Sequence, residues 1–271
     1  MFTSIKKMII SKIERRNYDI IRSVSKEKML EFLKKIYPKK TKHDFIRMGA
    51  NFDGGYLVPD NLSEIGACYS PGVSDISEFE KDCINRGMKV YMADKTVSKP
   101  NLKGNKFHFL KKHIGCINSE EFITIDKWVI KTSKKSDTDF LLQMDIEGFE
   151  YASIINISEK LLNKFRIIII EFHSLESIWH PHFFSIIEVA FSKLLVNHSV
   201  VHIHPNNSYG SIVKNDIKIP KIIEVTFLRK DSGVLEEYQT KFPHPLDKDN
   251  IKGKSMVLSK DLFYSKNERI K

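Results

Sequence analysis

The chain has 271 residues, 41% of them hydrophobic and 11% aromatic, which suits one large globular domain with an appendage. Its formal net charge of +10 favours anionic partners. The sequence has no arginine-rich tract interleaved with aromatic residues, so nucleic acid is not the leading candidate. No apolar run could span a bilayer and the start lacks the apolar centre of a signal peptide, so we expect a cytoplasmic protein without stable membrane insertion.

The first 40 residues predict a helical extension. Apolar residues recur at helical spacing between Ile5 and Ile36, and Pro38 closes the segment. The extension could pack on the body, form a homodimer or lie on a membrane surface. We favour packing or dimerisation, because the apolar stripe is narrow and is interrupted by Asn17 and Ser23. We therefore divide the chain into a helical extension, 1–40, and a main domain, 41–271.

From residue 65 onward, strands and helices are predicted to alternate. The expected strands cover residues 65–70, 89–94, 106–114, 139–145 and 165–173. The expected helices lie within residues 75–87, 121–132, 148–156 and 181–198. The run "FRIIIIEFH" would be apolar on both faces, as in the centre of a parallel sheet.

Two late strands, 199–204 and 221–230, depart from this alternation. The segment between them is too short for a convincing crossover helix, so we expect an antiparallel pair. Five parallel-type strands followed by a closing antiparallel pair predict an α/β fold. Its doubly wound, Rossmann-like sheet would be of the class I methyltransferase type.

Ligands of such sheets bind beyond the carboxyl ends of the strands. The first turn there, "YSPGV", comprises Tyr69, Ser70, Pro71, Gly72 and Val73, and its glycine would let the backbone approach a ligand. A plain structural turn explains the same residues equally well. Asp94 ends the next strand, where an acidic residue can accept hydrogen bonds from ribose hydroxyls or can cap the following turn.

Carboxylates gather after the two central strands. Asp145 and Glu147 are two residues apart and would point the same way, as would Glu171 and His173 at the end of the neighbouring strand. Glu150 falls in a first helical turn, where the helix dipole explains it. Like charges this close raise one another's pKa unless a cation is present, which predicts a magnesium or manganese ion. The alternative is a neutral histidine that bridges carboxylates.

The strand "VVHIHPNN" supplies a further polar set. His202 and His204 share one face and Asn206 follows, so they could bind a polyol or act as a base. A turn-forming asparagine pair, Asn206 with Asn207, is the equally favoured alternative.

These pieces, in this order, resemble the FkbM family of S-adenosylmethionine-dependent methyltransferases. The similarity rests on "MDIEGFE", "IIIIEFH" and "ITIDKWV". The segments "RMGANFDGGYLVPD", "YSPGVSDISEFE", "VHIHPNN" and "FPHPLDKDN" resemble a branch that contains O-methyltransferases of bacterial capsule and surface-polysaccharide biosynthesis. Some enzymes of that branch depend on a metal and act on nucleotide-linked heptoses. The resemblance covers roughly Phe45 to Asn250.

The resemblance implies roles for particular residues. The 69–73 turn and Asp94 would hold S-adenosylmethionine, and Asp145, Glu171 and His173 would bind Mn²⁺ or Mg²⁺. The acceptor would be a nucleotide-diphosphate sugar, faced by Tyr56, His202, His204 and Asn206. Catalysis would fall to Glu147 or His204 as the proton acceptor, with Arg47 and Lys95 as candidates to hold the diphosphate. The first motif departs from the family's common glycine-rich version.

Other functions remain compatible with the sequence. A methyltransferase could act on a lipid, a peptide or RNA instead of a sugar. A non-enzymatic protein could work at a membrane surface or as a scaffold through its basic N-terminal helices.

Overall fold

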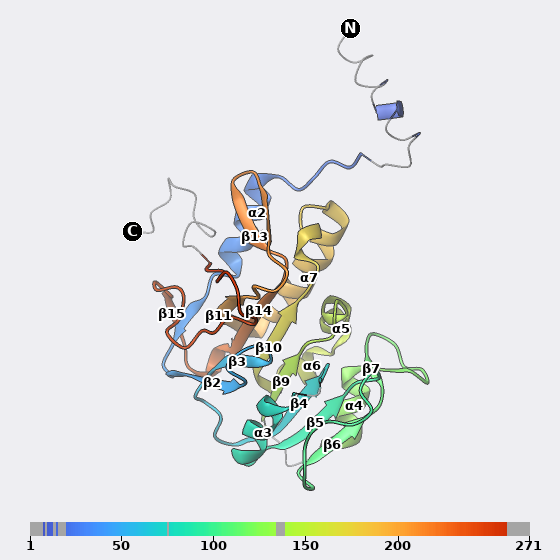
Figure 1. Ribbon diagram of the computed structural model, residues 1–271, viewed down its shortest axis with the longest axis vertical. Helices are drawn as coiled ribbons and strands as arrows, with labels where there is room; N and C mark the ends of the chain where they lie inside the picture. The colour runs from blue at the N-terminus through green and yellow to red at the C-terminus, as the bar shows by residue number, and fades with distance from the viewer. Residues whose placement is uncertain are drawn as a thin grey trace.

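A seven-stranded sheet organises the chain (Figure 1). It is seen in a computed structural model that describes residues 8, 10–12, 15, 20–74, 76–133 and 139–258. The order across the sheet is β11-β14-β10-β9-β4-β5-β6. Its strands are β4 (Ile65–Pro71), β5 (Lys89–Ala93), β6 (Phe107–Leu110), β9 (Asp139–Met144), β10 (Phe165–Phe172), β11 (His198–Pro205) and β14 (Ile223–Arg229).

Most of the sheet is parallel. Strands β6, β5, β4, β9 and β10 pair in parallel with their neighbours, whereas β14 runs antiparallel to both β10 and β11. Helices α3 (Glu78–Asn85), α4 (Ile125–Thr132), α5 (Glu150–Asn156), α6 (Glu159–Leu162) and α7 (Pro181–Asn197) lie between strands in the sequence. The predicted α/β class with a mainly parallel central sheet is confirmed, and it is consistent with a Rossmann-like methyltransferase.

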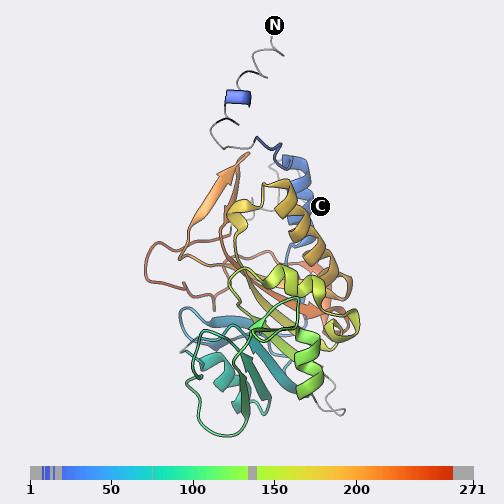
Figure 2. The same cartoon turned by 90° about the vertical axis from the view of Figure 1, so that its right-hand side faces the viewer.

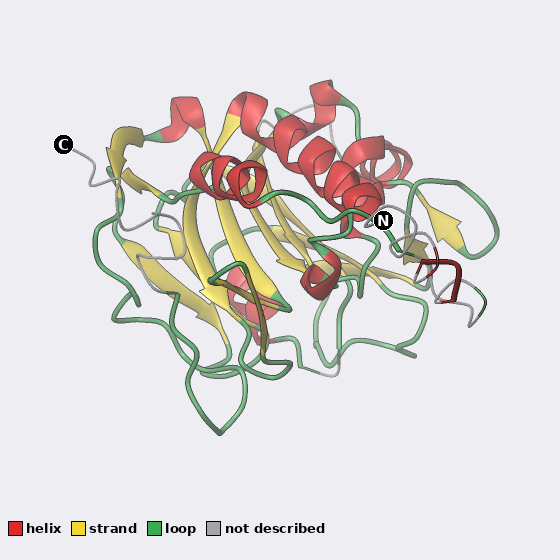
Figure 3. Ribbon diagram, turned by 90° about the horizontal axis from the view of Figure 1, so that it is seen from above, coloured by secondary structure: helices red, strands yellow, loops and turns green. Residues whose placement is uncertain are grey.

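Both faces of the sheet are covered, so its central strands are mainly apolar. All eight residues of β10 are buried. Alternate residues enter two different cores, because successive side chains of a strand point to opposite faces. Ile168 and Ile170 pack in the larger core, while Ile167 and Ile169 pack in the smaller one. Figure 3 shows most helices gathered over one face.

The smaller core is closed by α3 and by a hairpin of β2 (Phe45–Gly49) and β3 (Gly55–Pro59). Phe79 of α3 lies against Tyr56 of β3, with ring centroids 5.6 Å apart. The hairpin loop between β2 and β3 carries Asp53. The hairpin therefore brings an early segment of the chain to the sheet.

Of the predicted N-terminal extension, the structure describes mainly one helix, α2 (Lys26–Lys35). Ser25 caps it by accepting a hydrogen bond from the Lys28 amide at 3.2 Å. Phe32 packs edge-on against Phe184 and Phe191 of α7, so this helix belongs to the larger core. Figure 2 shows α2, in blue, beside α7. The expectation of a homodimer through the N-terminal helices stays a prediction, and most of the residues before 20 lie outside the described part of the chain.

The segment between β11 and β14 forms a hairpin of β12 (Ser211–Lys214) and β13 (Ile217–Pro220). Short strands β1 (Lys39–Thr41) and β15 (Val234–Tyr238) pair with each other, as do β7 (His113–Ile114) and β8 (Phe122–Ile123). Across the part of the chain that the structure describes, no helix combines the length and the apolar character needed to cross a bilayer.

Candidate active site at the carboxyl end of the sheet

Side chains from β9 and β10 meet where these parallel strands end. Asp145 directly follows β9, Glu171 is the penultimate residue of β10 and His173 directly follows that strand. Parallel pairing of β9 with β10 places their carboxyl ends at the same edge of the sheet. The three side chains predicted to bind a metal are therefore brought together.

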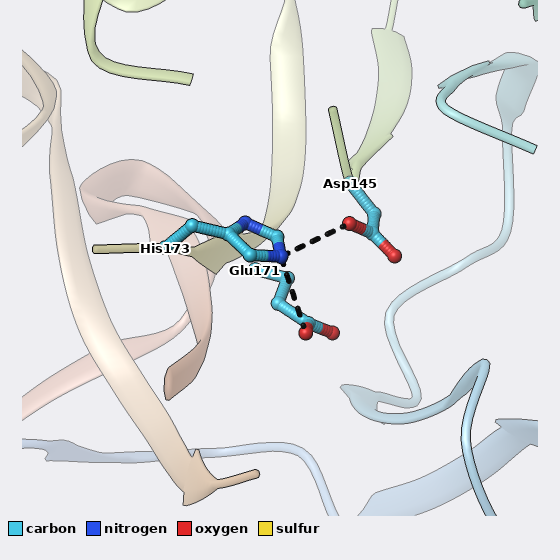
Figure 4. Close-up of side chains that lie close together, drawn as sticks. All are labelled: Asp145, Glu171 and His173. Atoms are coloured by element: carbon cyan, nitrogen blue, oxygen red, sulfur yellow. Dashed lines mark ion pairs between the residues drawn. The ribbon is translucent and has the colours of Figure 1, made fainter. Parts of the chain in front are cut away.

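Their polar atoms face a common point (Figure 4). The His173 Nε2 atom lies 3.7 Å from Asp145 Oδ1 and 3.7 Å from Glu171 Oε1. One ligand atom of each residue lies within 4.8 Å of the others. Asp145 Oδ1 and Glu171 Oε2 are buried without a hydrogen-bond partner among the described residues. Buried polar atoms normally have a partner, so these oxygens fit a ligand that the protein itself does not supply.

Glu150 fixes the orientation of the His173 ring. Its Oε1 atom lies 2.9 Å from His173 Nδ1 and accepts hydrogen bonds from the amides of Ile146 and Gly148, at 3.2 and 3.0 Å. Because a carboxylate accepts, Nδ1 donates to Glu150, which leaves Nε2 on the side of Asp145 and Glu171. A carboxylate behind a histidine is the usual support of a metal ligand. The helix-dipole interpretation of Glu150 from the sequence missed this contact.

Burial and mutual repulsion dominate the electrostatics of the cluster. Burial raises the pKa of Asp145 to about 7, against the charge of His173 and with help from Glu147 and Glu150. Burial, and then the charges of Asp145 and Glu224, raise the pKa of Glu171 to about 10. Burial works to lower the pKa of His173, but the hydrogen bond to Glu150 and the nearby carboxylates raise it overall. The site thus holds excess negative charge that a cation would relieve.

Two loops position Asp145. Gly72 has a φ of +81°, and a Cβ atom built on it would lie 1.3 Å from the Asp145 carbonyl oxygen. The Asp145 amide donates a hydrogen bond to the Pro71 carbonyl at 3.1 Å. The turn after β4 therefore touches the turn after β9, and only glycine fits at the contact.

Glu147 lies on the solvent side of the cluster. Its φ is +54° and its side chain is 81% exposed, yet its Oε2 atom is 3.4 Å from His173 Nε2. A positive φ is uncommon for a residue with a side chain, and such conformations concentrate at functional sites. Glu147 is the cluster carboxylate with the freest access to solvent.

The residues predicted to hold the cofactor surround the same edge. Tyr69 is buried and stacks on Tyr91 with centroids 4.9 Å apart, so only its backbone faces the turn. Ser70 Oγ is also buried and lies 2.5 Å from Glu80 Oε1 and 2.7 Å from Gln143 Oε1. Val73 is buried in the smaller core. The turn could thus contact a cofactor mainly through the backbone of Pro71 and Gly72.

Asp94 caps the turn that follows β5. Its Oδ1 atom accepts hydrogen bonds from the Thr96 amide and hydroxyl, both at 2.6 Å, and from the Val97 amide at 3.3 Å. This is the alternative that the sequence left open for Asp94. The other carboxylate oxygen remains for a ligand, so a role in binding ribose stays a prediction.

The residues predicted to face the acceptor adjoin the cluster. Asn206 donates a hydrogen bond from Nδ2 to Glu171 Oε1 at 3.0 Å. Tyr56 accepts one from Gln143 Nε2 at 3.2 Å, and burial raises its pKa well above the usual range, as do the charges of Asp145 and Glu171. Asn206 and Tyr56 therefore connect the acceptor side to the candidate metal ligands.

Two histidines flank a buried aspartate on the same side. His202 Nε2 lies 2.9 Å from Asp247 Oδ1, and His204 Nδ1 lies 3.6 Å from the same oxygen. Burial works to lower the pKa of His204, but Asp247 and Glu224 raise it overall. Neither ring nitrogen of His204 has a hydrogen-bond partner among the described residues. His204 is thus held near a carboxylate with its ring available to a ligand.

Several polar residues of this edge were missed from the sequence. Glu224 stands in an apolar strand, and Asp53, Asp247 and Asn250 lie in loops. Asn250 donates from Nδ2 to Asp53 Oδ1 at 3.1 Å and to Glu224 Oε1 at 2.6 Å. The charged residue in "IIEVTF" was the available signal, because a carboxylate inside a buried strand requires compensation.

The basic residues proposed for a diphosphate are engaged elsewhere. Arg47 donates from Nε to the Ala50 carbonyl at 2.8 Å and from Nη2 to the Phe52 carbonyl at 3.0 Å. Lys95 lies 3.7 Å from Glu121. The charge of Glu224 nevertheless acts on Arg47, which places this guanidinium near the cleft.

Comparison with known proteins points to one activity. Residues 74–194 match the family model described as the methyltransferase FkbM domain. A search of curated proteins finds no match. Among solved structures, a Pyrococcus horikoshii protein provisionally named an RNA methyltransferase is similar over 75% of this chain and 95% of its own, with 10% identity and a TM-score of 0.31. A TM-score this low carries no argument.

The match spans most of the candidate site. It contains Asp94, Asp145, Glu150, Glu171 and His173, while the turn at residues 69–73 and the acceptor side lie outside it. A methyltransferase domain implies S-adenosylmethionine as the methyl donor. The similarity of residues 74–194 to the FkbM domain, in a chain with a mainly parallel seven-stranded sheet, supports a methyltransferase family for this protein.

Proposed function

We propose that this protein is a metal-dependent O-methyltransferase that transfers a methyl group from S-adenosylmethionine to a hydroxyl of a nucleotide-linked sugar. The sugar would be a heptose and the product a component of a capsule or surface polysaccharide, as the sequence resemblance implies. The observation that carries the proposal is the convergence of Asp145, Glu171 and His173 within the segment that matches a methyltransferase domain.

The donor set fits a divalent ion such as Mn²⁺ or Mg²⁺. Two carboxylates and one imidazole nitrogen face one point, and Asp145 Oδ1 is buried without a partner in the described parts of the chain. Oxygen ligands with one imidazole suit such ions. When bound, the ion would lower the pKa of an acceptor hydroxyl and hold its oxygen in line with the methyl group.

The protein's own residues would orient the donor. The turn after β4 presents the backbone of Pro71 and Gly72 at the edge of the sheet, beside Asp145. Asp94 stands at the end of the adjacent strand β5 and keeps one carboxylate oxygen for a hydroxyl group. Methyl transfer needs close and linear placement of donor and acceptor, which a rigid pair of turns would supply.

His204 is the better of the two candidates for the proton acceptor. It is 7% exposed, it lies near Asp247, and the net effect of Asp247 and Glu224 raises its pKa. A raised pKa suits a group that must take a proton from a hydroxyl. Glu147 has a carboxylate at the mouth of the cluster, but its 81% exposure leaves it close to bulk water. We therefore propose that His204 Nε2 accepts the proton of the acceptor hydroxyl.

The test begins with the full-length protein. Calorimetry with S-adenosylmethionine is expected to detect binding, and mass spectrometry of nucleotide sugars after incubation is expected to detect a methyl-sized gain. Treatment with a chelator should abolish turnover, and Mn²⁺ or Mg²⁺ should restore it. Full turnover by the metal-free protein would reject the metal dependence, and absence of donor binding would reject methyl transfer.

A matched pair of variants assigns the ion to its ligands. Asp145→Asn is expected to lower kcat/KM by at least about 1000-fold, or about 4 kcal/mol of transition-state stabilisation. Glu237→Gln removes a carboxylate from an exposed position of β15 and should leave the activity unchanged. Activity retained by Asp145→Asn, with the fold intact by circular dichroism, would reject the role of Asp145.

A further inference from the structure

A second cluster of carboxylates lies beside the first. It comprises Asp53 from the β2–β3 loop, Glu171 from β10 and Glu224 from β14, with one oxygen of each within 4.8 Å of the others. We propose that these three residues bind a second divalent cation, and that Glu171 bridges it to the ion at Asp145 and His173. This inference goes beyond the proposed function, which needs only the first ion.

The strand pairing places two of these acids in direct opposition. Glu171 and Glu224 are partners in the antiparallel register of β10 and β14, so their side chains share one face of the sheet. Their residues are only 4% and 6% exposed. Like charges directly opposite each other on a strand pair are destabilising, and burial adds to the cost. Without a bound cation, this pair of carboxylates is therefore expected to destabilise the folded protein.

The protein supplies neutral donors to these acids. Asn250 donates to Asp53 and Glu224 through the same Nδ2 atom, and Asn206 donates to Glu171 Oε1. Among the described residues, no lysine or arginine forms an ion pair with Asp53, Glu171 or Glu224, and His173 is the ion-pair partner of Glu171. The charges of His204 and, more weakly, Arg47 act on Glu224. The amides thus hold the three carboxylates in place, and His204 offsets only part of their charge.

A separate observation points to a ligand. Glu171 Oε2 is buried and has no hydrogen-bond partner in the described parts of the chain, although Asn206 and His173 engage Oε1. Glu171 therefore has one oxygen committed to its neighbours and a second one free. A carboxylate with two separate oxygens can bridge two ions, as in sites that hold metals about 3.5–4 Å apart.

The chemistry of the second cluster selects the ion. Its ligands are oxygens only, which suits the hard cations Mg²⁺, Mn²⁺ and Ca²⁺, whereas the first cluster includes an imidazole. Asp53 is exposed and would give the ion a route from solvent. Two divalent ions would balance the negative charge of the four ligand carboxylates, which would reduce the repulsion of an anionic acceptor such as a diphosphate.

The experiment counts ions. Chelator-stripped, full-length protein is titrated with Mn²⁺, and the stoichiometry is read by calorimetry and native mass spectrometry. We expect two ions per wild-type chain, and one in Glu224→Gln and in Asp53→Asn. Asp145→Asn should also retain one ion, the one at the second cluster. Glu237→Gln, an exposed control with the same substitution as Glu224→Gln, should bind two.

Electron paramagnetic resonance provides an independent readout. Two Mn²⁺ ions bridged by Glu171 should show magnetic coupling, which the single-ion variants should lose. One ion per wild-type chain, or two ions in Glu224→Gln and Asp53→Asn, would overturn the inference and leave protonated carboxyls as the explanation. If Asp145→Asn lowered the number of bound ions but Glu224→Gln did not, the proposed function would stand and the second cation site would be rejected. If Glu224→Gln lowered the number but Asp145→Asn did not, the second site would stand and the metal ligands of the proposed function would be rejected.

Discussion

Each end of strand β9 has a half-buried aspartate, and the surroundings of the two are opposite in charge. Asp139 begins the strand, and its carboxylate lies 2.6 Å from both Arg166 of β10 and Arg229 of β14. Asp145 follows the last residue of the strand and faces Glu171 and His173 instead. The same backbone thus carries one acid that the protein neutralises and one that it leaves exposed to further negative charge.

The pKa values follow this contrast. Burial works to raise the pKa of Asp139, but hydrogen bonds from Arg229 and Arg166 lower it overall. Burial raises the pKa of Asp145 to about 7. A protein that can place two guanidinium groups at one end of a strand could have done so at the other. His173 compensates Asp145 only in part, and the negative charge that remains at the carboxyl end supports the ligand site proposed above.

The largest effect expected from this comparison concerns stability without metal. Asp139→Asn leaves Arg166 and Arg229 without their carboxylate and should lower the free energy of unfolding by about 3 kcal/mol. Asp145→Asn removes a buried like charge and should leave the stability of the metal-free protein unchanged or higher. Urea unfolding after chelation measures both. A loss of comparable size in the two variants would refute the contrast between the ends.

A smaller effect is expected where the two turns touch. Gly72→Ala should lower the free energy of unfolding by about 2 kcal/mol more than Gly87→Ala, because its Cβ would collide with the Asp145 carbonyl. Gly87 has a φ of +90° but open space around it, so its variant isolates the cost of the backbone conformation. Thermal unfolding of both variants measures the difference. Equal losses would show that the turns have room to separate.

Loss of the hydrogen bond between Glu150 and His173 should have a smaller effect, on metal affinity. Glu150→Gln keeps the shape of the side chain but weakens its hold on His173 Nδ1, so Mn²⁺ affinity should fall about 10- to 100-fold. Calorimetric titration of the two proteins measures the ratio. Glu159→Gln, in the exposed first turn of α6, is the control and should bind as the wild type does. Unchanged affinity in Glu150→Gln would remove Glu150 from the site.

The smallest effect is a dependence on pH. The pKa of Asp145 rises from 3.8 to about 7 on folding, so its carboxyl stabilises the folded state at low pH and loses this contribution as pH rises through about 7. Relative to Asp145→Asn, the chelated wild type should lose about 1–2 kcal/mol between pH 6 and pH 8. Thermal unfolding across this range measures the difference. A constant difference would contradict the raised pKa.

The sequence predicted most of what depends on strand order. Asp145, Glu171 and His173 could be placed together because each follows or ends a strand of an alternating pattern, and parallel strands end at one edge. It could not predict the contribution of Glu224, whose position depends on the register between β14 and β10. Asp53 reaches the site through a hairpin that packs on the opposite core, a contact between distant segments.

Local rules also misjudged particular side chains. Glu150 satisfies the helix dipole, which hid its contact with His173, and Tyr69 turns its ring into the core although it borders the predicted cofactor turn. Period-two alternation gives the face of a residue but not which neighbour covers that face. The functional meaning of these positions therefore had to come from the packing.

The contact between Gly72 and the Asp145 carbonyl has a thermodynamic consequence. With no space between the two turns, neither can shift without displacing the other. Under the proposed function, a methyl donor that displaced the first turn would alter the affinity of the ion side, and linkage requires the reverse effect to have the same magnitude. The absence of a side chain at Gly72 would then couple the proposed methyl donor to the proposed metal ion.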